Sequence, residues 1–370
     1  MGIAFFGINK SFDYYQIGGT DSFVRRISTE LVQNGDEVDY VLYGSKRDEE
    51  IPVIPGLRMY YFRSWGDALN AIRGKGYDHV VEIYMPPWDR IAFMRFRQKH
   101  NDSIKFHIVY FGWPEQWLKR YLSFAEACSS TLNGRVFVIS PRQYHYVRKW
   151  CKKPVLIWPP VPEEYFTTPF LKDNPERLRI TWIGRLDLGK GIKEIIDIFR
   201  RLKDNPKVEL KLCGHYWERD AQGKALHKWL VNQDEIPYIK SAYSGRAPEM
   251  EKTICELLKQ TDILVLPYWK LSSTIDTPLL MLEAMAALSA VLCKPLGDIP
   301  KIYGNPFFMP DGQEFVDRSV EIICRLTREE IRNERDRIFR QNRRLNFGAS
   351  AVSRRFRSAL QGRDVPEIHL

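Results

Sequence analysis

Two separate segments of the chain place charged side chains where a phosphorylated ligand could be held. In the first, Arg185 ends an apolar run that starts at residue 178, and Lys190 stands in a glycine-containing turn before a helical pattern that begins at Ile192. A guanidinium fork and an ammonium at the start of one helix suit a diphosphate, because they neutralise charge that backbone amides alone cannot. The alternative is a surface turn with two solvated cations, since short motifs recur by chance.

The second segment joins an apolar run to a helical pattern through a short polar loop. The run from Asp262 to Pro267 is typical of a buried parallel strand, and from Thr277 to Ala287 the spacing follows the 3.6-residue period of a helix. Glu283 falls in the opening turns between residues expected to be buried, so its carboxylate needs a partner; a surface carboxylate is the alternative. A helix start facing the end of a parallel strand is where open α/β sheets bind phosphorylated ligands. The segment therefore predicts a nucleotide-type ligand.

The elements that would position these residues alternate along the whole chain. Strand-like and amphipathic runs follow one another in both halves, which predicts an α/β fold with doubly wound parallel sheets. The predicted strands are residues 2–8, 37–43, 57–62, 79–84, 104–110, 136–139 and 155–158, then 179–183, 208–213, 263–267 and 290–293. The predicted helices include residues 20–34, 92–100, 115–128 and 141–151, an exposed charged helix at 325–344 and a last helix at 351–360. A length of 370 residues suits two domains.

Several motifs in a fixed order resemble one protein family. They are the segment from Gly184 to Gly191, the strand end Leu266-Pro267, the run Leu282-Glu-Ala-Met-Ala-Ala287, the turn Gly297-Asp-Ile-Pro300, the glycine pair Gly18-Gly19 with the helix after it, and the connector from Ile157 to Phe166. Together they resemble the retaining glycosyltransferases with the GT-B fold, family 4 (glycosyl transferases group 1). The resemblance covers nearly the whole chain.

This resemblance implies two Rossmann-like doubly wound domains that face a central cleft. Residues 1–160 would form the N-terminal acceptor-side domain, with the C-terminal helix in residues 348–370 packing back on it. Residues 161–176 are rich in proline and polar residues and are expected to form the linker. Residues 177–347 would form the domain that binds a nucleotide-diphosphate sugar.

The resemblance also assigns roles to single residues. Arg185 and Lys190 would neutralise the diphosphate as the glycosidic bond breaks, and Glu283 would accept hydrogen bonds from the ribose hydroxyls. These three are the predicted catalytic residues of a metal-independent hexosyltransferase-type enzyme (EC 2.4). No cofactor is expected beyond the nucleotide-diphosphate sugar, which acts as co-substrate.

Further residues are predicted to contact the two substrates. The predicted donor-binding set is Gly18, Gly19, Gly184, Asp276, Thr277, Pro278, Leu279 and Arg246. In this set the glycine pair would approach the diphosphate closely, which only residues without a side chain allow. Arg246, in the turn that begins at Tyr243, would line the pocket for the base. Asp21 and Arg25, on the first helix, are the acceptor-side candidates.

The chain departs from the family pattern at three places. The family usually has an acid eight residues before Glu283, where this chain has Ile275. Asp276 could replace it with a one-residue shift, or Thr277 and loop amides could take over. Leu288 stands where glycine is usual, and Phe111-Gly-Trp-Pro114 stands where a histidine is often found. The donor sugar therefore cannot be copied from well-known members.

The positive charge is concentrated in two windows, from Arg90 to Lys153 and from Arg325 to Arg357. The net charge is +10, and the window from Arg90 to Lys153 holds 13 Lys and Arg against 3 Asp and Glu, interleaved with aromatic residues. Such segments suit an anionic membrane surface, which would place the protein at the cytoplasmic face of a membrane near a glycan or lipid-linked acceptor. Solvated helix faces are the alternative. Nucleic acid is disfavoured, because no nucleic-acid-binding signature accompanies the cations.

Composition excludes several other classes of protein. No run of 18 apolar residues exists to span a membrane, and the N-terminal residues do not have the pattern of a signal peptide. The six cysteines form no CxxC pair, which fits a reducing cytoplasm, and the seven histidines form no HxxxH or HExxH motif, so no metal site is predicted. His107 is expected to be a satisfied strand histidine.

Two other functions stay open. The missing acid at position 275 allows a catalytically silent GT-B protein that binds a nucleotide or acts as a scaffold. A sugar-nucleotide epimerase or phosphorylase would use the same fold, although no lysine stands out for the pyridoxal group of a phosphorylase. A nicotinamide dehydrogenase is disfavoured, because no GxGxxG follows the first predicted strand.

Overall fold

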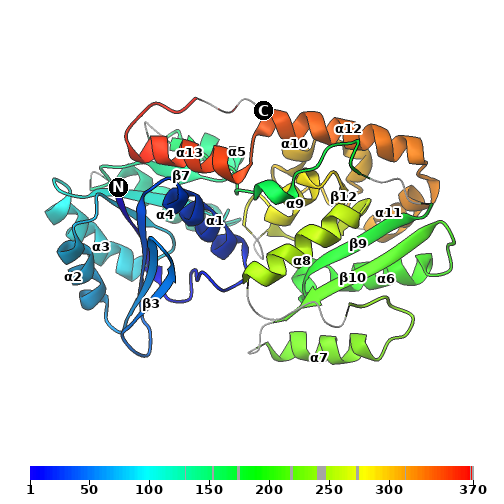
Figure 1. The fold of residues 1–370 in the computed structure, drawn as a ribbon, viewed down its shortest axis with the longest axis horizontal. Coiled ribbons are helices and arrows are strands. Elements are labelled where there is room, and N and C mark those ends of the chain that lie inside the picture. The colour runs from blue at the N-terminus through cyan, green and yellow to red at the C-terminus, as the bar shows by residue number, and fades with distance from the viewer. Residues whose placement is uncertain are drawn as a thin grey trace. The chain divides into compact units, whose positions relative to one another are not determined.

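The computed structural model describes all residues except 130, 152–153, 173–175, 217–219, 240–246, 272–274, 313, 367 and 369–370. The chain divides into two compact units (Figure 1). Unit 1 comprises Met1–Pro160 and Phe347–His369, and unit 2 comprises Val161–Asn346. In Figure 1 unit 1 runs from blue to green, with the red helix α13 added, and unit 2 runs from green to orange.

Unit 1 is built on a sheet of eight strands in the order β3-β4-β2-β1-β5-β6-β7-β8. Every neighbouring pair is parallel except β3 and β4, which are antiparallel. Sequence analysis missed β3, because its glutamates and Pro52 do not resemble a strand, and the edge position tolerates both. The strands are β1 (Gly2–Ile8), β2 (Glu37–Tyr43), β3 (Glu49–Ile54), β4 (Leu57–Phe62), β5 (His79–Glu82), β6 (Lys105–Tyr110), β7 (Val136–Val138) and β8 (Pro154–Leu156).

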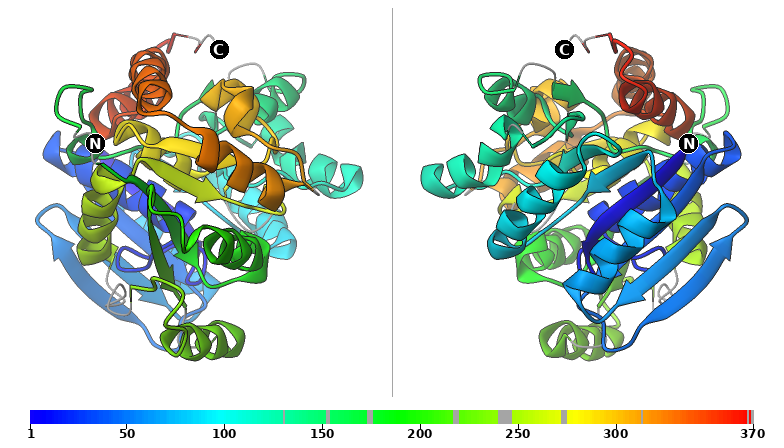
Figure 2. Two further views of the ribbon diagram at one scale, coloured as in Figure 1. Left: turned by 90° about the vertical axis from the view of Figure 1, so that its right-hand side faces the viewer. Right: turned by 90° about the vertical axis from the view of Figure 1, so that its left-hand side faces the viewer.

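Helices cover both faces of this sheet, because successive residues of a strand point to opposite sides. Phe6 lies 5.0 Å from the Phe93 ring, in a core with α2 and α3, whereas Phe5 stacks on Phe356 of α13 at 6.2 Å. Figure 2 shows both faces of the sheet covered. The helices are α1 (Gly19–Gln33), α2 (Trp65–Lys75), α3 (Pro87–His100), α4 (Trp117–Phe124), α5 (Pro141–Val147) and α13 (Ala349–Leu360).

The interior of unit 1 contains polar and charged side chains that contact one another. His107 accepts a hydrogen bond at Nδ1 from the Arg135 amide (2.9 Å), and its Nε2 lies 3.1 Å from Nδ1 of His79. The expectation of a satisfied strand histidine is confirmed. Arg97 is completely buried, and its Nη2 donates to Glu126 Oε1 at 2.5 Å, while Nη1 lies 3.6 Å from Glu82 Oε2. Burial and the charge of Glu126 raise the pKa of Glu82 to about 8.

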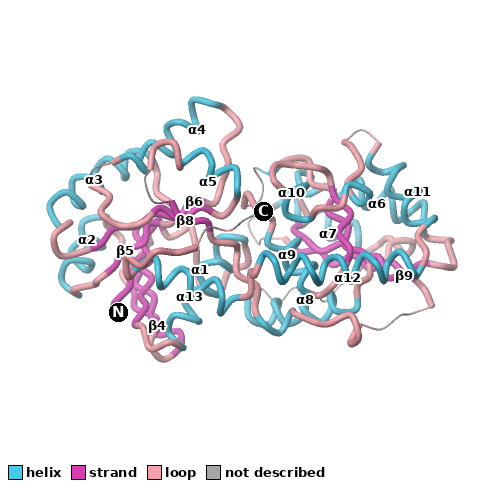
Figure 3. Tube along the Cα trace, turned by 90° about the horizontal axis from the view of Figure 1, so that it is seen from above, coloured by secondary structure: helices cyan, strands magenta, loops and turns pink. Residues whose placement is uncertain are grey.

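Unit 2 has a smaller parallel sheet in the order β10-β9-β11-β12. Helices α6 and α11 lie on one side of it, and α8, α9 and α12 lie on the other (Figure 3). The strands are β9 (Leu178–Arg185), β10 (Val208–His215), β11 (Ile263–Leu266) and β12 (Ala290–Cys293). The helices are α6 (Ile192–Leu202), α7 (Ala221–Val231), α8 (Ala247–Gln260), α9 (Leu279–Ala286), α10 (Ile299–Tyr303), α11 (Phe315–Arg325) and α12 (Arg328–Leu345). The prediction of two Rossmann-like α/β units is confirmed.

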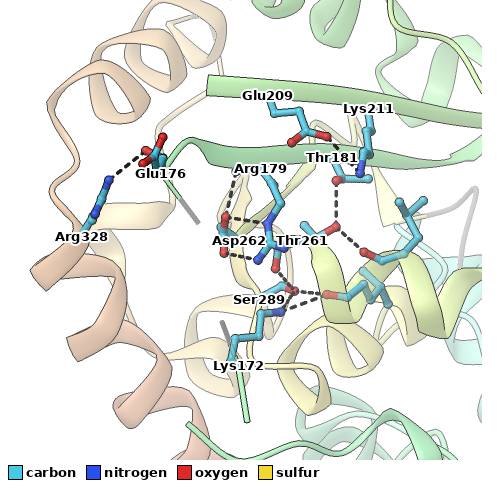
Figure 4. A network of polar contacts seen from close by, with 12 residues as sticks. Lys172, Glu176, Arg179, Thr181, Glu209, Lys211, Thr261, Asp262, Ser289 and Arg328 are labelled. Carbon is cyan, nitrogen blue, oxygen red and sulfur yellow. Dashed lines mark hydrogen bonds and ion pairs between the residues drawn. The ribbon is translucent and has the colours of Figure 1, made fainter. Parts of the chain in front are cut away.

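A buried ionic network at the start of β11 ties α12 to the sheet of unit 2, and Figure 4 shows the part of it between Asp262 and Arg179. Asp262 accepts from the backbone amide of Arg179 at 2.8 Å and from its Nε at 3.2 Å, and it also accepts from Arg335 of α12. The prediction that this charged helix is simply exposed is therefore wrong, since Ile331, Arg335 and Ile338 are buried. The few spaced apolar residues form a stripe that packs, and one arginine is neutralised inside.

The segment expected to form a linker packs on unit 2 in its described part. The Lys172 ammonium is buried and donates to Leu258 O (3.1 Å), Ala287 O (2.7 Å) and Ser289 Oγ (3.3 Å), as Figure 4 shows in part. The Tyr165 hydroxyl donates to Glu251 O at 2.9 Å. The hydrogen bonds from the Lys172 ammonium to these carbonyl oxygens hold the segment before β9 against α8 and α9.

We expect replacement of Arg97 by methionine to lower the free energy of unfolding by about 3–5 kcal/mol, because it leaves Glu82 and Glu126 buried without that guanidinium. Because the pKa of Glu82 is about 8, the part of the loss that involves Glu82 should be small below pH 8 and grow above it. Urea unfolding at several pH values measures it.

The matched control is Arg95→Met, at an exposed position of the same helix, where the change should stay within about 0.5 kcal/mol. Equal losses for the two variants would show that the buried ion cluster does not stabilise unit 1.

Candidate functional site

The predicted catalytic residues lie where the strand order of unit 2 reverses. Strand β9 has β10 on one side and β11 on the other, and the chain continues from β11 to β12. In open α/β sheets, the carboxyl ends of the strands at such a reversal are where ligands bind. Arg185 is the last residue of β9, and Pro267 directly follows β11.

A tight turn carries the chain from β9 to α6. Arg185 Nη2 donates to Asp187 Oδ2 at 2.5 Å, and Asp187 Oδ1 accepts from the Gly189 amide at 2.7 Å. Gly191 has φ 77, a left-handed conformation that favours glycine. A Cβ on Gly191 would lie 2.2 Å from the carbonyl oxygen of Pro267. Gly191 therefore lets the turn pack directly on the end of β11.

This packing brings Lys190 to the aromatic residue after Pro267. Lys190 Nζ lies 4.5 Å from the ring centroid of Tyr268, a cation–π contact. Burial, and then the positive charge of Arg185, lower the pKa of Lys190 to about 8. An ammonium in this position is destabilised by its surroundings, and an anionic ligand would relieve that cost.

Glu283, in the other segment, influences the same aromatic residue through its charge. It is buried in α9, which begins at Leu279, and Pro278 is the N-cap. Burial and the negative charge of Glu283 raise the pKa of Tyr268, and the positive charge of Arg185 lowers it. Lys190 therefore contacts Tyr268, the charges of Arg185 and Glu283 act on the same residue, and all four lie within unit 2.

Sequence reasoning missed two residues of this cluster, Tyr268 and His215. His215 is the last residue of β10 and pairs in register with Arg185. Burial and the charges of Arg185 and Lys190 lower the pKa of His215 to about 3, so its imidazole is neutral at physiological pH. The sequence does place both residues at or just after the end of a predicted strand. It does not show which strand ends are neighbours, because that depends on the order and register of the strands.

The other predicted donor-binding residues of unit 2 have different surroundings. Asp276 and Thr277 are buried in the loop that leads to α9, next to the buried Ile275. Gly184 lies within β9, where an added Cβ would be 3.0 Å from the Trp182 ring. Arg246 lies outside the described residues.

Leu288 follows α9 at the position where the resembled family has glycine. It has φ 55, one of two non-glycine residues with positive φ among the described residues, and it is completely buried. The backbone therefore keeps the left-handed turn that glycine would adopt easily, while the leucine side chain fills the interior.

In unit 1 the predicted residues cluster after β1, at the corresponding reversal between β1 and β5. Helix α1 begins at Gly19, and a Cβ on Gly18 would lie 2.3 Å from Asp21 Oδ2. Asp21 Oδ1 accepts from the Asp13 amide at 2.8 Å. Arg25 is buried and donates from Nη1 to the carbonyl oxygens of residues 14 and 16 at 2.9 and 3.0 Å. In their described contacts, Asp21 and Arg25 therefore hold the loop before α1.

Neither a metal cluster nor a membrane span is found in the part of the chain that the structure describes. No group of three or more His, Cys, Asp or Glu side chains is placed there to hold a metal ion. Of the helices in the same residues, none is both long and apolar enough to cross a bilayer.

Comparison with known proteins identifies the region that carries this cluster. Residues 177–325 match the family model described as Glycosyl transferases group 1, and they include Arg185, Lys190 and Glu283. No curated protein sequence matches the chain.

The whole chain shares its fold with solved structures of low sequence identity. HepE from Anabaena, in complex with UDP and glucose, has a TM-score of 0.70 and 12% identity, with 98% of this chain and 99% of that chain covered. The catalytic domain of starch synthase IV from Arabidopsis thaliana, bound to ADP and acarbose, has a TM-score of 0.62 and 10% identity, with 98% and 99% covered. These likenesses show the GT-B fold, as the sequence predicted.

We expect Asp21→Asn to stabilise the protein at neutral pH. Burial raises the pKa of Asp21 to about 6, from an ordinary value of 3.8. Between these values the folded state holds the proton more tightly than the unfolded state, so wild-type stability falls relative to Asp21→Asn as pH rises from about 4 to 6. The difference should be small at pH 4 and reach on the order of 2 kcal/mol at pH 7. Urea unfolding of both proteins across this range measures it.

Asp102→Asn, at an exposed position of unit 1, serves as control and should give a flat difference. A flat difference for Asp21→Asn as well would contradict the expected burial of its carboxyl group.

Proposed function

We propose that the protein is a retaining glycosyltransferase of family 4, which moves a hexosyl group from a nucleotide-diphosphate sugar to a hydroxyl of a glycan, lipid-linked or other acceptor. One observation carries this proposal. At the strand reversal of the region that matches the glycosyltransferase family, Lys190 contacts the Tyr268 ring, and the charges of Arg185 and of Glu283 from a distant part of the sequence act on the same residue.

The chemistry of the cluster fits the departure of a diphosphate. When the bond between the sugar's anomeric carbon and the diphosphate oxygen breaks, negative charge grows on that oxygen. Arg185 and Lys190 supply prearranged positive charge where it develops. The acceptor oxygen forms the new bond on the same face of the sugar, and its proton passes to the departing diphosphate. In this proposal no divalent metal is required, because the two cations and the backbone amides at the start of α6 share its task.

Glu283 and the residues around it would position the nucleotide. Its carboxylate would accept hydrogen bonds from the two ribose hydroxyls, and Asp276 or Thr277 would serve the sugar in place of the acid missing at position 275. Gly18 and Gly19 remain proposed for the diphosphate, and Asp21 and Arg25 for the acceptor side. HepE with UDP and starch synthase IV with ADP support a nucleoside diphosphate as the donor's leaving group, and the base stays open.

The test is donor turnover. Purified protein is screened for hydrolysis or transfer with UDP-, GDP-, ADP- and dTDP-sugars. Lys190→Met should reduce turnover of the accepted donor by about 100-fold or more, as loss of one charge-stabilising group does elsewhere. Lys193→Met, at an exposed position in α6 just after the turn that carries Lys190, should keep it. Nucleotide binding without turnover of any donor would favour a catalytically silent GT-B protein instead.

The pH dependence of donor binding supplies a separate prediction. Because the pKa of Lys190 is about 8, the ammonium is present below pH 8 and is lost above it. The dissociation constant for the donor nucleoside diphosphate should therefore be constant from pH 6 to 7.5 and rise above pH 8, by at most about tenfold per pH unit. In Lys190→Arg the charge persists, because guanidinium does not lose its proton in this range, so the profile should be flat. Isothermal titration measures both profiles, and identical profiles would contradict the assigned role of Lys190.

We also propose that unit 1 binds an anionic membrane surface through α4. Four residues on one face of this short helix, Trp117, Leu118, Tyr121 and Leu122, are exposed, with Trp117 at 75% and Leu122 at 61%. The Trp150 ring lies 5.8 Å from Tyr121, and Lys119 lies within the same helix. Exposed rings beside cations suit the interface of an anionic bilayer better than solvated faces would, since water disfavours the rings. This would place the enzyme on the cytoplasmic face of a membrane.

Vesicle flotation tests this surface. The protein should float with vesicles that contain anionic phosphatidylglycerol, and less so with neutral phosphatidylcholine or at high salt. Trp117→Ala combined with Leu122→Ala should reduce the bound fraction at least fivefold, whereas Phe307→Ala, an exposed aromatic residue of unit 2, should not. Binding that ignores lipid charge and salt would contradict the proposal.

A further inference from the structure

Unit 2 contains a hollow that none of the predicted donor-binding residues lines. It lies at the carboxyl end of β12 and has a volume of about 510 Å³. This is within the ~300–1,000 Å³ typical of small-molecule pockets. Its lining includes the aromatic residues Trp269 and Phe315 and the charged residues Glu194, Lys294 and Asp311.

The polar groups of this pocket are incompletely satisfied by the described residues. Lys294 is 5% exposed, and its Nζ lies 4.3 Å from the ring centroid of Trp269 and 5.4 Å from that of Phe315. The closest carboxylate oxygen, Glu194 Oε1, lies 3.6 Å from Nζ, which is beyond hydrogen-bond distance. Glu194 Oε1 is buried and has no hydrogen-bond partner among the described residues. Buried polar groups of this kind usually have a partner, so a bound ligand would complete the site.

The charges of the lining indicate the class of that ligand. One ammonium faces two carboxylates, Glu194 and Asp311, so the pocket offers no excess positive charge to a phosphate or a carboxylate. A neutral ligand with several hydroxyl groups fits better, because hydroxyls donate to carboxylates and accept from an ammonium. The Trp269 side chain is 62% exposed and forms an apolar platform.

We infer that this pocket binds a glycosyl unit of a neutral oligosaccharide. A pyranose ring has an apolar face of C–H bonds that can pack on the Trp269 indole, and a rim of hydroxyls that can reach Lys294, Glu194 and Asp311. A few convergent polar groups beside an aromatic surface are the general composition of a small-molecule site. The inference depends on the lining of this pocket and not on the proposed transfer reaction.

The pocket borders the catalytic cluster but is chemically separate from it. The Trp269 amide donates to Gly189 O at 3.4 Å, so the residue touches the turn that carries Lys190. Its neighbour Tyr268 contacts Lys190, whereas the Trp269 ring contacts Lys294. Two successive aromatic residues after β11 therefore serve two different sites.

The test is saturation-transfer difference NMR with neutral gluco-, manno-, galacto- and xylo-oligosaccharides and N-acetylglucosamine oligomers. At least one series should bind, and Trp269→Ala should raise its dissociation constant at least tenfold. Glu194→Gln should raise it at least threefold. Trp229→Ala, which removes a partly exposed tryptophan elsewhere in unit 2, should leave binding unchanged. Lys190→Met should also leave it unchanged, which separates this pocket from donor turnover.

The inference is overturned if no neutral oligosaccharide binds, or if binding persists in Trp269→Ala. Binding only of phosphorylated or uronic-acid sugars would overturn it as well, because a lining with no excess positive charge should not prefer an anionic sugar. Trp269→Ala changes an exposed side chain, so far-ultraviolet circular dichroism should show a folded variant.

Discussion

The site in unit 2 depends on a contact that only glycine permits. Gly191 takes a left-handed conformation and lies so close to the carbonyl of Pro267 that a Cβ would be 2.2 Å from its oxygen. This contact joins the turn after β9 to the end of β11, and it fixes Lys190 over the Tyr268 ring. In this position the Lys190 ammonium loses water, and this burial lowers its pKa to about 8. A diphosphate would restore favourable surroundings, so the geometry and the electrostatics of the site have one cause.

Charged side chains have different surroundings at the two ends of the sheet in unit 2. At the amino end, Asp262 accepts hydrogen bonds from both Arg179 and Arg335 inside the protein, and α12 is held in place as a result. At the carboxyl end, Arg185 is partly neutralised by Asp187, while Lys190 lies against an aromatic ring. A buried ion pair stabilises the fold weakly at best, whereas a desolvated cation that lies against a ring favours an anionic ligand. In this unit the surroundings of a cation, not its residue type, therefore distinguish the two cases.

The sequence predicted much of the fold. It also made Arg185, Lys190 and Glu283 site candidates, because strand ends and helix starts are visible in the spacing of apolar residues, and their catalytic roles stay predictions. Tyr268 and His215 could not, because their place in the cluster depends on the register between strands. Strand β3 was missed because Pro52 and its glutamates are tolerated only at an edge. Helix α12 was taken as exposed, because the partner that buries Arg335 is Asp262, far away in the sequence.

The most direct test of the account is the affinity for a nucleoside diphosphate, measured by isothermal titration with UDP, ADP, GDP and dTDP. The account predicts that the wild type binds at least one of them, and that Gly191→Ala and Lys190→Met each weaken binding at least tenfold. Gly304→Ala is the matched control, because Gly304 also has positive φ but an added Cβ would have only an ordinary contact, 3.6 Å from Arg337 Nη1. Wild-type affinity in a folded Gly191→Ala protein, or no binding of any of the four by the wild type, would contradict it.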